Sequence, residues 1–426
     1  MAAVVLGSIA LGSTALGSGL LLGLQGILLI LILGSIVFYL ACMVFTWDFF
    51  RKAPINAHQT RNHPVNNHPL DNHPVDSANH PVANLVANPV ANQVSILVPI
   101  CGLDAGAWEN WTSLCHQQCD RYEILFGVVD PNDPAVPLLY ELQKTYPDRV
   151  RIFPGLTPRG ANHKDSTLSY LLEQAQYDWL ILADSDIRVA PDYIQTVVSP
   201  LLNGQVGMIT CAFIARSPKH LGAAIASLGR CCDFIPSALI ARAMDGGLRF
   251  AIGMTMALHR STLEAAGGLH LNRIGSDYNL GKRVAAAGYR VELSHLIMES
   301  DTGRERLRDV YQRELRWSRT IRFNRGSIYY TIAFCYGTIY CLPLLLLQGY
   351  HYWVIIVSIT TLTLRYGQAA IAVLSMGAPK LLSWLWVLPL RDLLSFIVWF
   401  VGCFGRQVFW RGRKLQIQED GLIHEI

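Results

Sequence analysis

A short apolar run that ends in two carboxylates constrains this chain more than any other feature. Residues 179–183 are Trp-Leu-Ile-Leu-Ala, and Asp184, Ser185 and Asp186 follow at once. Such a run is typical of a buried strand in a parallel sheet, and open α/β sheets hold their ligands at the carboxyl edge of such strands. Two carboxylates at that edge can share a divalent cation, Mg²⁺ or Mn²⁺, with phosphate oxygens. The alternative is a strand that ends in an ordinary Asp-Ser turn.

The chain around this strand alternates apolar strands with helical segments. We expect further strands at residues 94–100, 122–129, 149–153, 206–213 and 250–258, and helices at 164–175, 191–202 and 261–266. This alternation predicts an α/β domain in which helices cover both faces of a mostly parallel sheet.

A helix is also expected between Ser276 and Gly288, with Ser276 as its N-cap and Asp277 in its first turn. The positive end of a helix favours the ionised form of an acid placed there. An ionised carboxylate is what a general base must be. The alternative is a plain helix-capping acid.

The amino-terminal region predicts a membrane anchor. Apolar residues make up 51% of the 426 residues and charged residues only 15%. Residues 20–45 form a nearly uninterrupted apolar run, which exceeds the roughly 20 residues that cross a bilayer. A cleaved signal peptide is the alternative, but no basic residue precedes the run and it is longer than an h-region of about 7–15 residues. Arg51 and Lys52 follow the run, so we expect the next domain to be cytoplasmic.

The carboxyl-terminal third predicts two to three more transmembrane helices, at residues 328–347, 352–376 and 381–404. Three full crossings would place the basic residues of segment 406–414 outside, against the positive-inside rule. Either the rule fails here or one segment is re-entrant. Arg391 and Asp392, inside the third span, could pair and border an acceptor site, or they could form a structural pair between helices.

Repeats, cysteines and net charge bear on four further questions: a tether, disulfides, a zinc site and nucleic-acid binding. Residues 62–93 repeat Asn-His-Pro, which favours an extended tether over residues 51–93, although the histidines could also collect metal. The ten cysteines lie partly in apolar runs, as expected of small buried hydrophobes in a reducing compartment. Cys115, His116 and Cys119 lack the second ligand pair of a zinc site. A formal charge of +4, scattered along the chain, gives no nucleic-acid-binding face.

Residues 304–325 form a strongly basic helical stretch that contains Arg313, Arg316 and Trp317. We interpret it as a juxtamembrane helix whose arginines meet lipid headgroups and ligand phosphates, because a guanidinium is a planar fork of donors. The alternative is a solvated charged face.

Five motifs in order, followed by apolar spans, resemble the ceramide glucosyltransferase family, including bacterial relatives that glycosylate hopanoids. They are residues 130–135, 184–189, 266–269, 277–278 and 313–317. The resemblance covers the chain from about Ser95 to its carboxyl terminus and leaves outside it two repeat tracts, the Asn-His-Pro tract and three Leu-Gly-Ser repeats within residues 6–18. It implies a GT-A-type nucleotide-sugar-binding domain at residues 94–326. The remaining segments are then an anchor at 1–50, membrane spans at 327–405 and a basic-then-acidic tail at 406–426.

The resemblance also implies roles for single acids. Asp130 would hold the uridine of a UDP-sugar. Asp184 and Asp186 would hold the diphosphate and its divalent cation, and Asp277 would be the general base. One base without a second carboxylate nucleophile implies a single displacement that inverts the anomeric centre.

Four further positions match donor-binding residues of the family, and two positions depart from it. The matches are Lys164, Arg313, Arg316 and Trp317. The residue before Asp277 is Ser276, where the family commonly has an acid. Segment 233–236 lacks the histidine that ceramide enzymes tend to carry before this proline, which weakens ceramide as the acceptor.

The sequence therefore predicts a multi-pass membrane enzyme with a cytoplasmic catalytic domain. It would transfer glucose or N-acetylglucosamine from a UDP-sugar to the hydroxyl of a membrane lipid, either ceramide-like or hopanoid. The alternatives are a processive polysaccharide synthase of the same fold, which the few carboxyl-terminal spans disfavour, and a non-catalytic membrane scaffold.

Overall fold

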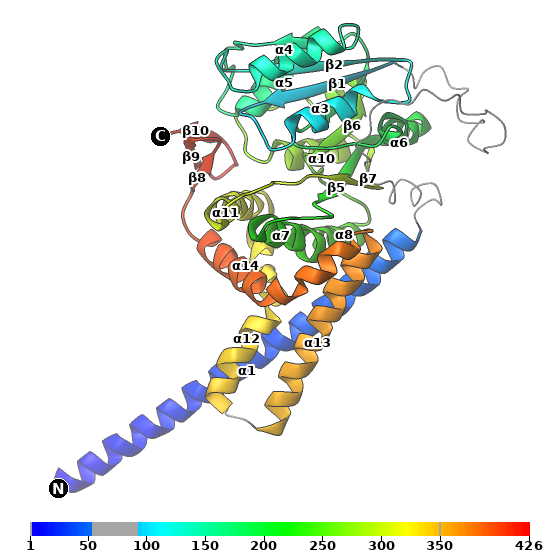
Figure 1. Cartoon of the computed structure of the whole chain (residues 1–426). Helices are drawn as coiled ribbons and strands as arrows, with labels where there is room; N and C mark the ends of the chain where they lie inside the picture. The colour runs from blue at the N-terminus through cyan, green and yellow to red at the C-terminus, as the bar shows by residue number, and fades with distance from the viewer. Residues whose placement is uncertain (1, 53–92, 349–350) are drawn as a thin grey trace.

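The computed structural model describes residues 2–52, 93–348 and 351–426, with no side chains described for residues 2–20. The expected tether, residues 51–93, lies outside the described residues except at its two ends. A long helix, α1 (Ala2–Arg51), leads to an α/β domain that stands on a group of apolar helices (Figure 1).

Seven strands form one mixed sheet in the order β3-β2-β1-β4-β6-β5-β7. Their bounds are β1 Gln93–Ile100, β2 Arg121–Val128, β3 Val150–Phe153, β4 Trp179–Ala183, β5 Val206–Ile214, β6 Thr255–His259 and β7 Arg290–Glu299. Strands β3, β2, β1 and β4 are parallel, as are β5 and β7, whereas β6 runs antiparallel to both of its neighbours. The predicted mostly parallel α/β sheet is confirmed, with one reversed strand inside it.

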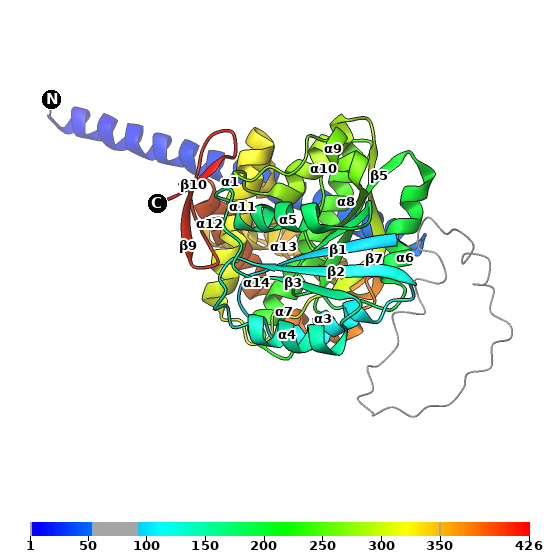
Figure 2. The same ribbon diagram turned by 90° about the horizontal axis from the view of Figure 1, so that it is seen from above.

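The apolar runs form strands because both of their faces are covered. Leu180 and Ile181 of β4 are fully buried, and Ile181 is in register with Ile96 of β1. Helices α5, α9 and α10 lie on one side of the sheet and α3 and α4 on the other (Figure 2). Their bounds are α3 Ala107–Cys115, α4 Val136–Thr145, α5 His163–Gln174, α9 Arg260–Ala265 and α10 Ser276–Ala286, and α6 (Tyr193–Val198) precedes β5.

Two local predictions were wrong. The strand expected at 250–258 begins only at Thr255, because the preceding backbone bonds to other groups: the Ile252 N–H donates to the Thr210 hydroxyl and the Asp184 N–H donates to the Met254 carbonyl. The N-cap of α10 is Gly275, at φ 64°, so Ser276 is the first helical residue. Glycine adopts this left-handed backbone without the steric cost that a side chain carries.

Between β5 and β6 the chain forms α7 (Leu221–Leu228), the π-helix η4 (Gly229–Phe234) and α8 (Ile235–Met244). This stretch is apolar enough to cross a membrane, but most of it is buried within the protein. After β7, α11 (Leu307–Arg325) and η5 (Gly326–Cys335) lead to the remaining apolar helices. These are α12 (Gly337–Gln348), α13 (Tyr352–Ser375), η6 (Pro379–Val387) and α14 (Leu388–Gly402).

The expected N-terminal and C-terminal membrane helices are confirmed as candidates. By length and composition, the described residues contain four candidate spans: Leu21–Arg51, Leu221–Met244, Tyr352–Ser375 and Pro379–Gly402. Helices α11 to α12, bent by 58° at their junction, form a further candidate. Figure 1 shows α1, α12 and α13 extending away from the α/β domain, whereas α14 lies across its base beside α7 and α11.

The carboxyl-terminal tail is a folded element. Strands β8 (Gln407–Trp410), β9 (Arg413–Ile417) and β10 (Ile423–Glu425) form an antiparallel sheet beside the α/β domain (Figure 1). Its apolar face packs on Ile274, next to the start of α10. Seven of the ten cysteines are buried, as expected of small hydrophobes, whereas Cys101 is exposed.

Candidate active site

The carboxyl ends of β1, β2 and β4 bring acids to one edge of the sheet. Asp184 and Asp186 follow β4, and Asp130 follows β2, on the far side of β1. Asp130 is exposed, and its Oδ1 accepts a hydrogen bond of 2.9 Å from the Asn132 N–H. The loop after β1 adds Asp104, whose Oδ2 accepts a hydrogen bond of 3.1 Å from Ser185 Oγ. Asp104 was missed in the sequence because it follows its strand as a lone acid.

Asp186 is the most strongly perturbed of these acids. Burial raises its pKa to about 6, and the charges of Asp184 and Asp104 add to the rise. The Ser300 hydroxyl lies 3.3 Å from its Oδ2. No group of three or more His, Cys, Asp or Glu side chains is arranged to hold a metal among the described residues. A pair of carboxylates nevertheless fits Mg²⁺ or Mn²⁺, because these ions usually take one or two carboxylates and complete their shell with water and substrate phosphates.

Lys164 lies between Asp184, one of the two expected metal ligands, and Asp277, the expected base. It lies in the first turn of α5, where the side chain of Asn162 caps the helix. Its ammonium forms an ion pair with Asp184 and donates to the Gly253 carbonyl at 3.3 Å. Burial alone would lower the pKa of Lys164, but the charges of Asp184 and then Asp277 raise it above its ordinary value. The lysine is therefore a fixed cation between two acids.

Asp277 reaches this group because two glycines allow close approach. A Cβ atom on Gly253 would lie 2.8 Å from Asp277 Oδ2, so only glycine leaves room for the carboxylate beside the turn before β6. A Cβ on Gly275 would lie 2.6 Å from Thr320 Cγ2, so glycine also lets the start of α10 approach α11. The structure thus brings Asp277, Lys164 and Asp184 together from three separate segments.

Helix α11 faces these acids with arginines. Arg313 forms an ion pair with Glu305 and lies 5.4 Å from the centre of the Trp317 ring, whereas Trp317 packs edge-on against Phe213. The Arg316 guanidinium is half-buried, and the charges of Asp277 and Asp184 act on it. Trp317 is therefore a partly buried support for Arg313.

Several donors in this region are buried without a partner. They are Nε and Nη2 of Arg313 and Nε of Arg230, a residue of η4 that the sequence analysis did not single out. The charge of Asp186 acts on Arg230, which donates to the Ser300 carbonyl at 3.3 Å. Unsatisfied guanidinium donors next to carboxylates that suit a cation are what a ligand with a diphosphate would require.

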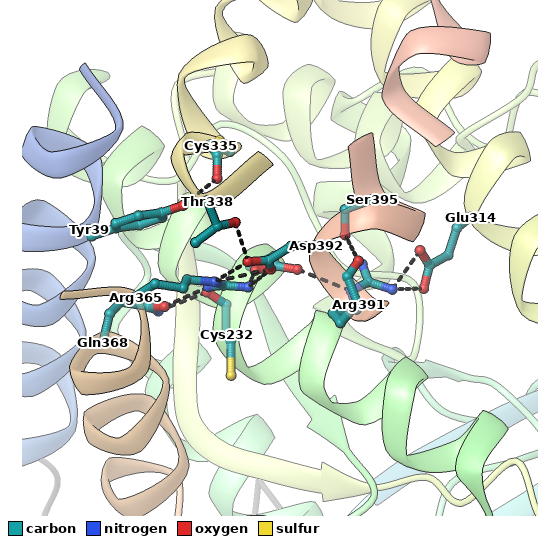
Figure 3. A network of polar contacts seen from close by, with 11 residues as sticks. Tyr39, Cys232, Glu314, Cys335, Thr338, Arg365, Gln368, Arg391, Asp392 and Ser395 are labelled. Carbon is teal, nitrogen blue, oxygen red and sulfur yellow. Dashed lines mark hydrogen bonds and ion pairs between the residues drawn. The ribbon is translucent and has the colours of Figure 1, made fainter. Parts of the chain in front are cut away.

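Arg391 and Asp392 do not pair with each other, contrary to one expectation, and the partners of both lie on other helices (Figure 3). Arg391 donates to Glu314 of α11 at 2.6 and 2.7 Å and to Asp233 of η4 at 3.2 Å. Asp392 accepts from Arg365 of α13 at 2.6 Å and from Thr338 of α12 at 2.7 Å. These residues form a buried network that joins helices, which favours the structural alternative.

An acid-lined sheet edge faced by partly buried cations suits a ligand that carries phosphate groups. Residues 68–423 match the model of glycosyl transferase family 21, and the chain belongs to this family. The match begins inside the Asn-His-Pro tract, earlier than the resemblance had suggested. The expected α/β domain is confirmed by the mixed sheet, and the resemblance to the ceramide glucosyltransferase family is confirmed by the family match and by the relatives that follow.

The individual relatives share less than a quarter of their aligned residues with this chain. The chain is 24% identical over 217 residues to ceramide glucosyltransferase 3 of Caenorhabditis elegans, covering 47% of this chain and 44% of the relative. It is 22% identical over 211 residues to ceramide glucosyltransferase 1 of the same organism, covering 49% and 45%. The matched region thus spans less than half the length of these relatives. A mannosyltransferase from Pyrobaculum calidifontis, solved with GDP-Man and Mn²⁺, aligns with a TM-score of 0.48 at 17% identity, covering 89% of this chain and 99% of that one.

Proposed function

We propose that this chain is an inverting, membrane-bound glycosyltransferase that moves a hexose from a UDP-sugar to the hydroxyl of a membrane lipid. The observation that carries the proposal is the single acid Asp277, which lies against Gly253 and whose charge acts on Lys164, the cation paired with Asp184. Membership of family 21 and its ceramide glucosyltransferase relatives support a lipid acceptor, ceramide-like or hopanoid.

We assign the residues that bind the UDP-sugar from their charges. Asp184 and Asp186 would hold Mg²⁺ or Mn²⁺, which offsets charge on the diphosphate when it is bound. Lys164 holds Asp184 in place through its ion pair. The unpartnered donors of Arg313 and the Arg316 guanidinium would bind diphosphate oxygens. Asp130, at the end of β2, would hold the uridine.

The acceptor side depends on Asp277. A lipid hydroxyl is a poor nucleophile near neutral pH, so a carboxylate that takes its proton as the new glycosidic bond forms is effective. The bond from the anomeric carbon to the diphosphate breaks in the same displacement, and its electron pair leaves with the nucleotide. With one base and no separate carboxylate nucleophile assigned, we expect inversion.

The arrangement of helices supports a multi-pass topology in which α1, α12 and α13 cross the membrane. In Figure 1 the α/β domain and the carboxyl-terminal sheet lie at the same end of these helices, and α14 lies across the base of the domain. Arg51, Lys52 and the basic residues of segment 406–414 are then on one side, which the positive-inside rule makes cytoplasmic. The conflict with three C-terminal crossings is avoided because residues 381–404 turn back to the domain.

Product analysis of the purified full-length protein in lipid nanodiscs tests this function. The protein would be given UDP-glucose, UDP-N-acetylglucosamine or GDP-mannose with ceramide, a hopanoid polyol or diacylglycerol, in parallel with the Asp277→Asn variant. We expect one sugar on an organic-soluble lipid, with inverted anomeric configuration by NMR, from a UDP-sugar only. A water-soluble polymer would indicate a polysaccharide synthase. Absence of transfer from every donor would overturn the proposal.

A further inference from the structure

The turn between β8 and β9 holds an arginine in an unfavourable backbone conformation. Trp410 pairs with Arg413, so Arg411 and Gly412 form a two-residue hairpin loop. Their φ angles are 47° and 79°, and Arg411 is the only non-glycine residue with positive φ in the part of the chain that the structure describes. Two-residue loops with positive φ at both positions strongly favour Asn-Gly. An arginine in place of asparagine costs backbone energy, which indicates that its side chain is used.

The Arg411 side chain points to the edge of the sheet that carries the metal acids. Its Nη1 lies 3.3 Å from Asp104 Oδ1, and Asp104 in turn accepts from Ser185, the residue between Asp184 and Asp186. The side chain is 47% exposed, so a ligand can reach the guanidinium. On the other side of the turn, the Arg316 guanidinium lies 5.1 Å from the centre of the Trp410 ring. The turn therefore contacts both the acids and the cations of the candidate active site.

The carboxyl-terminal sheet fixes the turn in this position. The Arg413 guanidinium donates to the Ala161 carbonyl at 3.0 Å, just before the helix that carries Lys164. The Ile423 N–H donates to the Asn272 carbonyl at 2.9 Å, and the Ile274 N–H donates to the Gly421 carbonyl at 3.0 Å, just before the helix that carries Asp277. Val408, Leu415 and Ile417 bury the interface with Ile274. The sheet is thus bonded to both segments that deliver the central side chains.

We propose that Arg411 is a donor-binding residue whose guanidinium binds the diphosphate of the nucleotide-sugar, so that the carboxyl-terminal sheet completes the donor site. The proposal rests on the proposed function. Asp104 holds the Arg411 guanidinium at the sheet edge. A diphosphate bound with its cation beside Asp186 would then be within reach of this guanidinium. Arginine suits this role because its paired donors match phosphate oxygens. The nucleotide-sugar would then be held between α11 and the carboxyl-terminal turn.

Three variants of the full-length protein separate binding from structure. Arg411→Gly removes the guanidinium and relieves the left-handed backbone, Arg411→Lys keeps the charge without the fork, and Arg406→Ala is the control. Arg406 belongs to the same tail, is 50% exposed and pairs with Glu419 at 3.1 Å. The affinities of UDP, GDP and uridine would be measured with Mn²⁺ present, together with the midpoint of thermal unfolding.

We expect Arg411→Gly to weaken UDP binding by roughly 10- to 100-fold, the range for lost charge-assisted hydrogen bonds. Uridine affinity should not change, because uridine has no phosphate, and the unfolding midpoint should stay or rise. Arg411→Lys should lie between this variant and the wild type, and Arg406→Ala should match the wild type.

Three outcomes would overturn the inference. If Arg411→Gly binds UDP as tightly as the wild type, Arg411 is a turn residue only and the proposed function stands. Equal losses for UDP and uridine, or a fall in the unfolding midpoint, would mean that the sheet merely shapes the site. If the wild type binds no nucleotide diphosphate at all, the proposed donor class fails, and this inference fails with it.

Discussion

Two clusters of charged side chains differ in whether their hydrogen-bond donors have partners. One is the helix network around Arg365 and Arg391, and the other is the candidate active site at the sheet edge. In the helix network, Arg365 uses Nε and Nη2 on Asp392, Nη2 also on Asp233, and Nη1 on Gln368, while its side chain is only 3% exposed. At the sheet edge, Arg313 is also largely buried, yet its Nε and Nη2 have no partner.

A buried donor without a partner costs about 1–3 kcal/mol, and more when it is charged. A ligand with phosphate oxygens would supply acceptors for the free donors of Arg313, whereas the matched groups of the helix network hold helices together. Burial alone therefore does not distinguish the two clusters, but hydrogen-bond satisfaction does. We interpret the sheet edge as the ligand site and the helix network as structural.

The largest effect should come from removing the cation at the sheet edge. A chelator should abolish transfer, and Mg²⁺ or Mn²⁺ should restore it, because the ion that Asp184 and Asp186 would hold offsets charge on the diphosphate. Asp186→Asn should weaken donor turnover sharply in the same assay. The matched control is Asp48→Asn, an exposed acid paired with Lys52 at the end of α1. Full activity in chelator, with Asp186→Asn near wild type, would refute the metal assignment.

Asp277→Asn should lower transfer by roughly 10²–10⁴-fold, the range for general acid–base catalysis, because the amide keeps the shape but takes no proton. UDP-sugar affinity should change little, since cation and nucleotide are held by other residues. Both quantities would be measured on one preparation of the variant. If transfer survives, or affinity falls with it, Asp277 is a binding or structural residue.

In the helix network, Asp392→Asn should affect stability and leave donor affinity unchanged. Breaking a buried ion pair costs about 3–5 kcal/mol, so the midpoint of thermal unfolding in detergent should fall clearly. Asp48→Asn, which breaks an exposed pair, should cost no more than about 1 kcal/mol. A loss of UDP affinity at an unchanged midpoint would place the network in the ligand site and remove the distinction between the clusters.

The sequence predicted the parts of the site that follow local rules. The apolar run before Asp184 and the first-turn acid Asp277 each have a local signature, and both lie where the expected strand and helix put them. Asp104 and Arg230 have no such signature, because only tertiary contacts bring them to Asp186.

The carboxyl-terminal tail is the clearest case of information that the sequence pattern did not carry. Its charges, basic and then acidic, indicated only a charged segment, because its strands are short and contain few buried residues. The position of Arg411 depends on backbone bonds to segments more than 100 residues away, such as Ile423 to Asn272. The partners of Arg391 and Asp392 were likewise set by helix packing, which adjacency in the sequence does not determine.

Asp165 tests this distinction, because its carboxyl has a hydrogen bond with Ser276 whereas its other oxygen is buried beside the candidate site. It is 2% exposed, lies between Lys164 and the start of α10, and its Oδ2 has no hydrogen-bond partner. Burial raises its pKa to about 7, although Lys164 opposes the rise. The folded protein therefore binds this proton more tightly than the unfolded chain does. Stability from this group is complete below about pH 4 and is lost as the pH rises through about 7.

Asp165→Asn should remove this loss of stability at high pH, because an amide does not ionise. We expect the variant to be more stable than the wild type at pH 8, by on the order of 2–4 kcal/mol, and the difference to shrink towards pH 4. Unfolding midpoints at pH 5 and pH 8 measure it, with Asp178→Asn, an exposed acid paired with Arg260, as the control. If Asp165→Asn is instead less stable at pH 8, Asp165 is ionised in the folded protein. It then belongs with the paired charges that the helix network represents, because Lys164 would be its partner as well as that of Asp184.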